Sequence, residues 1–490
     1  MCWILYLKMK FVLKKKLWIS LTLILIILMP FKLASAQDEG PGGPVYIVQE
    51  GDTLWEIAQR FGVSIDELSR ENGITDPGQL AAGAQLVIPG LQGVQGILAT
   101  ESVPFGENLR SLSRRYRIPT ETLIRLNHLV SPGELYIGAN LVVPQNDSQA
   151  EVGKRITLSA GQSLLELAVI EGANPWTITE SNDLPGTSSV IPGDVLRLPQ
   201  SSAPGDGAPG NGAPDGPGGL PGAITAVEIT PNSLSQGDTG VIRVKTDDQL
   251  SLSGSLGERE LHFFADENGD YVALQGVHAL AEAGIYPLTM QGTLSDGTVF
   301  GFSQMVPILS GDFKYYKLVV PPETLDPANT EPEDKLWNAL PVAASPEKMW
   351  HGVFQSPVSQ PSPCGFTSYF GERRSYNDSP YNYFHTGLDF CYNYNEAVNK
   401  IFAPAPGVVV FAGPLTVRGN ATMIDHGWGV YTGYMHQEEI LVKVGDKVET
   451  GQEIGIVGET GRVNGPHLHL EFWVGGVQVD PMDWLEREFP

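Results

Sequence analysis

The sequence predicts a multidomain protein with three small βααβ modules, an all-β sandwich and a C-terminal domain that is mainly antiparallel β. Three observations predict this organisation. The N-terminal third repeats its pattern every 55 residues, the segment 223–310 carries short alternating apolar runs, and the segment 351–490 is rich in strand and turn patterns around a double histidine. A fixed repeat marks small modules, and a period of two marks strands.

Residues 1–36 are expected to form a secretion signal. Three lysines at 14–16 precede an apolar run over 17–29, and Ala34–Ala36 supplies a small-residue cleavage site. A signal anchor is the less favoured alternative, because the run is short for a membrane span and ends at Pro30. We therefore expect a protein that is secreted or held in the cell envelope, with no stable membrane span after cleavage. Translation from Met9 would give a more usual signal start.

The chain is acidic, with 56 acidic and 31 basic side chains and a formal net charge of −25. Cleavage after Ala36 would remove six lysines and no acidic residue, which leaves a mature net charge of −31. Such a charge favours solubility and repels nucleic acid, so no nucleic-acid partner is expected.

The 55-residue repeat defines three modules, at 45–90, 98–145 and 154–200. Five sets of equivalent residues share the same interval. These sets are Gly51, Gly106 and Gly161; Leu54, Leu109 and Leu164; Asn72, Asn127 and Asn182; Gly83, Gly138 and Gly193; and Pro89, Pro144 and Pro199. A common register over so many positions indicates three copies of one fold.

The first copy shows which fold this is. Its pattern predicts a strand over 45–48, a helix over 54–61, a second helix over 65–72 with Ser64 as its cap, and a strand over 85–88. Each copy is therefore expected to be βααβ.

The run from Tyr46 to Ala58 resembles a LysM module, a fold that binds N-acetylglucosamine chains of peptidoglycan or chitin. The resemblance implies a glycan groove between one early loop and the segment 76–81. The glycan-binding residues that it implies are Gly51, Asp52, Thr53 and Leu54. The second and third copies depart from this pattern, with Glu107-Asn108 and Gln162-Ser163 at the equivalent positions, so their sugar binding is in doubt.

The middle of the chain is predicted to contain a linker, a β-sandwich and a connector. From 201 to 222, 13 of 22 residues are Gly or Pro, which predicts a linker. The alternating runs of 223–310 favour an immunoglobulin-like β-sandwich that acts as a spacer. Its His262 and His278 have no spaced partners and are expected to be structural. Residues 311–350 are expected to form a Pro-rich connector.

His467 and His469 are the most informative residues. They alternate with apolar Leu468 and Leu470, which predicts a half-buried strand with both imidazoles on one face, about 7 Å apart. Two histidines on one rigid face can share the work of a metal site, one as a ligand and the other handling protons.

His385 and Asp389 add a second histidine and a carboxylate, which the flanking sequence places in extended structure. Two histidines and one aspartate around an open position form a catalytic zinc shell, whereas calcium or magnesium would require more oxygen ligands. On spacing alone, either His467 or His469 could be the second histidine ligand.

Three motifs, at 385–389, 434–436 and 465–469, resemble those of the lysostaphin/LytM-type zinc endopeptidases, which have the duplicated hybrid motif fold. The segments 401–410, 442–448 and 451–455 agree with that family as well. The resemblance covers about residues 351–490. It implies one zinc ion held by His385, Asp389 and His469, with His436 and His467 as the catalytic pair.

The resemblance implies a secreted peptidoglycan hydrolase that is anchored by its LysM modules and cleaves peptide stems or cross-bridges of the bacterial cell wall. The two histidines of the catalytic pair would deprotonate the attacking water and return a proton to the leaving amine. One alternative is a non-catalytic activator of other cell-wall hydrolases. A second is a wall-binding structural protein. The presence of all five site residues argues against the activator.

Cys364 and Cys391 are the only cysteines that would remain after signal cleavage. They bracket the two upstream ligands, and export favours a disulfide between them.

Overall fold

The computed structural model describes residues 43–490 apart from gaps at 77, 79, 92–93, 117, 146–154, 160, 183, 192, 199–216, 360–364 and 398. The expected signal (1–36), most of the predicted linker (201–222) and Cys364 therefore lie outside the described residues. Within the described part of the chain, no helix combines the length and hydropathy that a membrane span requires. The chain divides into two compact units, 1–97 and 98–490.

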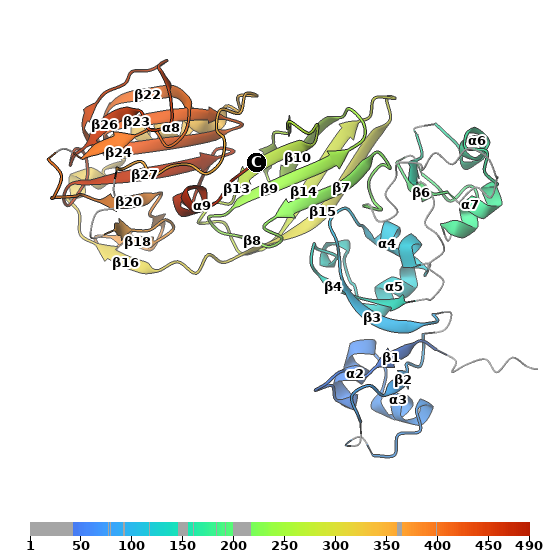
Figure 1. Ribbon diagram of the computed structural model, residues 1–490. Coiled ribbons are helices and arrows are strands. Elements are labelled where there is room, and N and C mark those ends of the chain that lie inside the picture. The colour runs from blue at the N-terminus through green and yellow to red at the C-terminus, as the bar shows by residue number, and fades with distance from the viewer. Residues whose placement is uncertain are drawn as a thin grey trace, which may run out of the picture. The chain divides into compact units, whose positions relative to one another are not determined.

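The first module has the predicted βααβ order (Figure 1). Its elements are β1 (Val45–Ile47), α2 (Leu54–Phe61), α3 (Ile65–Glu71) and β2 (Gln85–Val87). The strands pair antiparallel. Both helices begin at capping boxes, in which Thr53 or Ser64 accepts a backbone hydrogen bond and a glutamate three residues later reaches back.

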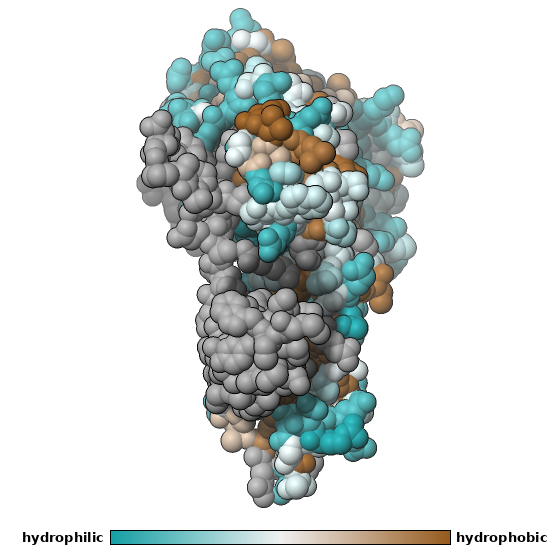
Figure 2. Space-filling model, turned by 90° about the vertical axis from the view of Figure 1, so that its right-hand side faces the viewer, coloured by the Kyte–Doolittle hydropathy of each residue, from teal (hydrophilic) through white to brown (hydrophobic). Residues whose placement is uncertain are grey.

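The second and third modules repeat the order. The elements of the second are β3 (Ile97–Ser102), α4 (Leu109–Tyr116), α5 (Thr120–Leu126), the short 3-10 helix η2 (Pro132–Glu134) and β4 (Asn140–Gln145). Those of the third are β5 (Arg155–Thr157), α6 (Leu164–Ile170), α7 (Pro175–Ser181) and β6 (Val195–Arg197). On the third module α6 exposes Leu165, Val169 and Ile170, and brown side chains gather on this face in Figure 2.

The repeated asparagine has a structural reason. The side chain of Asn72 accepts a hydrogen bond from the Val87 backbone and donates to its carbonyl, so it ties the end of α3 to β2. Asn127 and Asn182 make the same pair of bonds with the last strands of their modules.

Residues 224–309 form two sheets around a shared apolar core. The strands are β7 (Ile224–Thr230), β8 (Leu234–Ser235), β9 (Thr239–Thr246), β10 (Ser251–Leu256), β11 (Arg259–Leu261), β12 (Phe264–Ala265), β13 (Tyr271–Gly276), β14 (Gly284–Thr293) and β15 (Val299–Leu309). One sheet has the order β11-β10-β14-β15-β8 and the other β12-β13-β9-β7. The alternation seen in the sequence is therefore confirmed as strand structure.

The connector is more ordered than its proline content predicted. Its elements are β16 (Tyr315–Leu318), η3 (Pro322–Leu325), α8 (Pro327–Ala339) and η4 (Leu340–Val342). Helix α8 begins with Asp326 as its cap and Pro327 at its first position, which is the usual place for proline in a helix. Strand β16 pairs in parallel with β18.

The C-terminal domain is mainly antiparallel β, as predicted (Figure 1). Its elements are β17 (Phe366–Ser368), β18 (Arg373–Tyr376), β19 (Tyr383–Phe384), β20 (Leu388–Cys391), β21 (Lys400–Phe402), β22 (Gly407–Leu415), β23 (Gly419–Gly427), β24 (Val430–Ile440), β25 (Lys447–Val448), β26 (Glu453–Val457), β27 (His467–Val474), β28 (Val477–Val479) and α9 (Pro481–Glu486). The main sheet runs β17-β20-β27-β24-β23-β22-β25.

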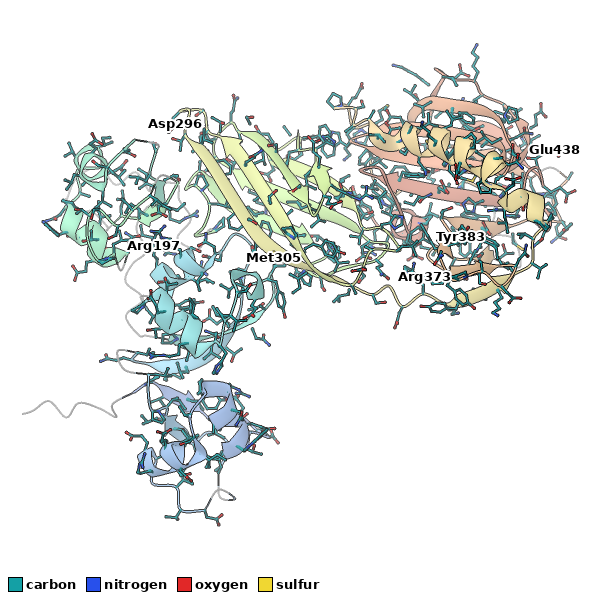
Figure 3. All side chains as sticks on the ribbon, turned by 180° about the vertical axis from the view of Figure 1, so that it is seen from behind. Arg197, Asp296, Met305, Arg373, Tyr383 and Glu438 are labelled. Atoms are coloured by element: carbon teal, nitrogen blue, oxygen red, sulfur yellow. The ribbon has the colours of Figure 1, made fainter. Side chains whose placement is uncertain are left out.

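The two faces of this sheet are covered differently. Even-numbered residues of β27, such as Leu470 and Phe472, pack into a core that also contains Val272 and Leu274 of the sandwich strand β13. Odd-numbered Trp473 packs with residues of α8 and β23–β24 into a second cluster. Figures 1 and 3 both show α8 lying across this second face. The histidines of β27 have odd numbers and therefore lie on the α8 face.

Candidate active site

The predicted ligands meet where β20 pairs with β27. Asp389 lies directly opposite His469 in the antiparallel register, and His385 lies in the turn just before β20. One possible ligand atom of each residue lies within 4.8 Å of the others, and all three side chains are buried. The structure brings together the three residues that the sequence predicted as a metal shell.

The contacts orient the donor atoms toward one another. Nε2 of His385 is 3.0 Å from Oδ1 of Asp389 and 3.0 Å from Nδ1 of His469, and this Nδ1 is 2.8 Å from the same oxygen. On the other side of the ring, Nδ1 of His385 is 2.9 Å from the carbonyl oxygen of Tyr369. A ring nitrogen that faces a carbonyl carries the proton, so Nε2 of His385 presents its lone pair to the cluster.

Nε2 of His469 lies 3.3 Å from Oγ1 of Thr386 and also faces the carboxylate of Glu471. Its Oε1 is 3.6 Å from Nε2 of His469, and its Oε2 accepts the indole N–H groups of Trp337 and Trp473 at 2.8 Å each. Burial would raise the pKa of Glu471, but its contact with His469 outweighs burial and holds this pKa at about 2. Burial would lower the pKa of His469, but the carboxylates of Asp389 and Glu471 outweigh burial and raise this pKa to about 9. Without a metal, Nδ1 of His469 therefore holds a proton toward Asp389, and a bound cation would replace that proton.

These residues fit a zinc ion. Two imidazole nitrogens and one carboxylate oxygen converge as acceptors, and acceptors facing one another at about 3 Å require a proton or a cation between them. Zinc takes such a set, whereas hard cations require more oxygens. Burial lowers the pKa of His385, which favours a neutral ligand. Burial would raise the pKa of Asp389, but the two histidines outweigh it and hold that pKa well below its usual range.

Gly387 lets His469 approach. A Cβ at this position would lie 2.8 Å from Nε2 of His469 and 2.1 Å from the carbonyl oxygen of Leu470, closer than side chains tolerate. The glycine between the two upstream ligands is therefore required by packing at the site.

His436 and His467 lie beside the cluster with matching orientations. Their ring centroids are 4.9 Å apart. Nδ1 of His436 donates to the carbonyl of Thr460 at 2.9 Å, and Nδ1 of His467 donates to that of Gly465 at 2.9 Å. In each ring Nε2 is the nitrogen that these backbone carbonyls do not engage, and Nε2 of His467 lies 3.7 Å from Oδ1 of Asp389. Burial, reinforced by the neighbouring histidines, lowers the pKa of His436 to about 3, so this ring is neutral at pH 7.

A backbone irregularity brings His436 to this face. Strict alternation along β24 would place it with buried Tyr434 on the opposite face of the sheet. Between Tyr434 and Gln437 the register with β23 shifts, and His436 adopts a left-handed φ of 63°. A bulge of this kind redirects a side chain, and here it turns the imidazole toward His467.

The connector forms part of the same site, which sequence reasoning missed. Glu333 of α8 accepts the backbone N–H groups of Val417 and Arg418 at 2.8 and 3.0 Å. The carbonyl of Arg418 in turn accepts the backbone N–H of His436 at 2.9 Å. Glu471 could have been found, because it continues the alternating row of polar residues on β27. No sequence signal links Trp337, 134 residues away, to this row.

In the first module, side chains of the implied glycan-binding loop form hydrogen bonds within the module itself. Oδ2 of Asp52 accepts the phenol of Tyr46 at 2.6 Å and the backbone N–H of Gln49 at 2.8 Å. Thr53 caps α2, and Leu54 is 2% exposed and belongs to the core. Gly51 is exposed, with a left-handed φ of 90° that suits glycine. These four residues build the loop, and their contact with glycan stays a prediction.

The equivalent loop of the second module is buried inside the second unit. Glu107 is 1% exposed, and its carboxylate accepts the backbone N–H of Gly218 at 3.2 Å. The backbone N–H of Gly106 donates to the side chain of Gln304 in the sandwich at 2.9 Å. Nearby, the N–H of Ile137 donates to the carbonyl of Met305, which Figure 3 labels. The loop is therefore a contact surface for the sandwich.

Cys391 lies at the end of β20 and is disulfide-bonded. Cys364, which the sequence predicted as its partner, lies outside the described residues, so the pairing stays a prediction.

Comparison with known families assigns the two ends of the chain. Residues 383–481 match Peptidase family M23. Residues 46–89 and 103–144 match the LysM domain. The third module, the sandwich and the connector lie outside these matches.

Three curated relatives resemble the C-terminal domain. Peptidoglycan DD-endopeptidase ShyA of Vibrio cholerae serotype O1 is 44% identical over 98 residues, 20% of this chain and 22% of that protein. DD-carboxypeptidase/endopeptidase Mpg of Neisseria meningitidis serogroup B is 42% identical over 98 residues, with the same coverage. An uncharacterized metalloprotease of Buchnera aphidicola is 33% identical over 142 residues, 28% of this chain and 37% of that protein. The chain thus matches well under half the length of each relative.

Proposed function

We propose that this chain, which carries a peptidase M23 domain at its C-terminus and LysM domains at its N-terminus, is a peptidoglycan hydrolase. It cleaves peptide bonds in the stems or cross-bridges of the bacterial cell wall. One observation carries the proposal. Three donor groups that fit zinc converge beside two further imidazoles, whose Nδ1 atoms are held by backbone carbonyls.

His385, Asp389 and His469 would hold the zinc. When bound, zinc supplies a Lewis acid that activates water and polarises the scissile carbonyl. His436, neutral at pH 7, accepts a proton from water at Nε2, and the carbonyl of Thr460 holds its ring in place. His467 faces it across the site and can stabilise the developing oxyanion or protonate the leaving amine.

The names of two relatives favour a bond between D-residues as the substrate. One of these names includes carboxypeptidase action, which releases a C-terminal residue whose α-carbon bears both the leaving amine and a free carboxylate. We propose that the third module is a degenerate LysM domain and that the sandwich is immunoglobulin-like. The protein would act outside the cytoplasm after signal cleavage, because its substrate and its glycan anchor lie in the cell envelope.

Zinc analysis and digestion of purified peptidoglycan test this function together. The mature chain should bind about one zinc ion, and chelation should abolish the release of fragments identified by mass. His469→Ala and Asp389→Asn should lose both zinc and activity. His436→Ala should keep zinc and lose about 10²- to 10⁴-fold in turnover. His262→Ala, an exposed histidine of the sandwich, is the matched control. Lytic activity in the absence of zinc would overturn the proposal.

A further inference from the structure

The cavity that holds the five predicted site residues also contains three arginines. Its volume is about 730 Å³, and Arg374, Arg418 and Arg462 all line it. Arginine recognises carboxylates through two parallel hydrogen bonds, so the charge balance of each arginine matters.

Arg418 is already neutralised by the protein. Its Nη1 lies 2.8 Å from Glu333 and 2.8 Å from Asp334, both on helix α8. Its side chain is 12% exposed. Arg418 therefore has a structural partner on the connector and little capacity for a ligand.

Arg374 has no such partner. Among the described residues no carboxylate lies within 4.0 Å of its guanidinium, and Nη2 donates to the hydroxyl of Ser368 at 2.8 Å. Glu372 reaches it only through this hydroxyl, which donates to that carboxylate at 2.5 Å. The group is half-buried, so the wall of the cavity holds a guanidinium that has no direct ion pair with any described residue.

Ser368 fixes where this guanidinium lies. It is paired with Asp389 across β17 and β20, so the group bonded to Ser368 lies next to the ligand cluster. On the neighbouring strand Tyr383, labelled in Figure 3, lies opposite Arg374.

Arg462 extends the positive wall. Its guanidinium lies 5.1 Å from the ring centre of Tyr376, two residues along β18 from Arg374, and it donates to the carbonyl of Thr324. It too has no carboxylate within 4.0 Å among the residues described. One wall of the cavity thus carries two cations for which the described part of the chain provides no carboxylate within 4.0 Å.

We propose that Arg374 is a specificity-determining residue that binds a free substrate carboxylate next to the scissile bond. The inference rests on the proposed function and narrows its substrate class to peptides in which the residue bearing the leaving amine carries this carboxylate. Two N–H groups of the guanidinium hold the carboxylate, and Arg462 adds positive charge to the same wall. The contact places the scissile bond at the ligand cluster.

Matched substrates test this. One is a purified cross-linked muropeptide dimer with the free carboxylate, and the other is the same dimer with that group amidated. The zinc-loaded mature chain should cleave the amidated dimer with kcat/KM lower by about 10- to 100-fold. Arg374→Gln should cleave the acid dimer as slowly as the wild type cleaves the amidated dimer. Its acid-to-amide ratio, which is kcat/KM for the acid dimer divided by kcat/KM for the amidated dimer, should therefore fall to about one. Arg374→Lys should have an intermediate acid-to-amide ratio, because lysine keeps the positive charge but lacks the two parallel N–H donors of the guanidinium.

Lys317→Gln is the matched control. Lys317 lies on β16, which pairs with β18, and its side chain is 67% exposed, so the change removes one nearby positive charge outside the cavity. Its acid-to-amide ratio should equal that of the wild type, and all variants should keep their zinc. An unchanged ratio in Arg374→Gln, or equal rates of the wild type on both dimers, overturns this inference alone. Failure of the wild type to cleave either dimer overturns the proposed function and the inference with it.

Discussion

The indole N–H of Trp337 donates to Oε2 of Glu471 over 2.8 Å, and both side chains are fully buried. This bond joins the connector helix α8 to the strand that carries His469. Gly433 makes room for the indole, since a Cβ there would lie 2.7 Å from Cζ2 of Trp337. The support of the candidate metal ligand therefore begins 46 residues before the part of the chain that matches Peptidase family M23.

Trp337→Phe should weaken zinc binding. The change keeps the aromatic packing but removes one donor from a fully buried carboxylate, which then holds His469 less firmly. Loss of such an outer partner costs about 10- to 100-fold in metal affinity. Competition with a chromophoric chelator measures it. Trp176→Phe, which alters a 69% exposed indole, should leave the affinity unchanged. If Trp337→Phe binds zinc as tightly as the wild type, Trp337 contributes only to packing.

Acid should destabilise the peptidase domain through His426. Its nitrogens bond to the carbonyl of Pro406 and the hydroxyl of Thr432, and burial lowers its pKa to about 4. Because the unfolded histidine titrates near 6.5, the unfolded chain binds more protons between these values. The stabilisation that neutral His426 gives the folded state is therefore fully present above about pH 6.5 and is lost as the pH falls toward 4.

From pH 7 to pH 5 this histidine should cost about 2 kcal/mol of unfolding free energy. Between pH 7 and pH 5, the unfolding free energy of His426→Gln should therefore fall by about 2 kcal/mol less than that of the wild type. Urea unfolding in the presence of a chelator measures both proteins. The comparison removes the opposite contribution of Asp480, whose pKa burial raises to about 6. Parallel pH profiles for both proteins would contradict the prediction.

Removal of residues 43–97 should abolish most binding to insoluble peptidoglycan. The first module keeps an exposed loop, whereas the equivalent loop of the second is covered by the sandwich. A pull-down assay measures the loss. The rate on a soluble muropeptide dimer should be unchanged, which shows that the peptidase is intact. If the shortened chain binds as tightly as the full one, anchoring lies in the other modules.

The protein recovered from outside the cell should show no free thiol before reduction. Cys391 is disulfide-bonded, and Cys364 is the predicted partner. A bond that closes a loop of about 28 residues stabilises the fold by about 3–4 kcal/mol in the chain-entropy model, so reduction should lower the melting temperature. Intact-mass and alkylation measurements decide it, and two alkylated cysteines in the native protein would refute the pairing.

Local patterns in the sequence predicted much of this structure. The alternation around His467 and His469 predicted β27, and the cap at Ser64 predicted the start of the second helix of the first module. In each case neighbours in sequence determine the structure.

Features that depend on distant partners were missed. Alternation places His436 on the wrong face, and only its resemblance to a family motif selected it. The bulge that turns it depends on pairing with β23. Trp337 was read as part of a connector, because its partner Glu471 is remote in sequence. Arg374 carries no local signal, since its significance comes from its place in the folded cavity, where no described carboxylate lies within 4.0 Å of it.

The apolar core that β13 shares with the peptidase sheet has a consequence for how the chain melts. Val272 and Leu274 pack with Phe472 and Trp484, and the indole of Trp484 donates to Thr239 of the sandwich at 2.9 Å. Residues that share one core unfold together, so calorimetry should register the sandwich and the peptidase as a single cooperative transition. A fragment cut at residue 351 would expose that apolar surface to water and should aggregate, although it contains every candidate ligand.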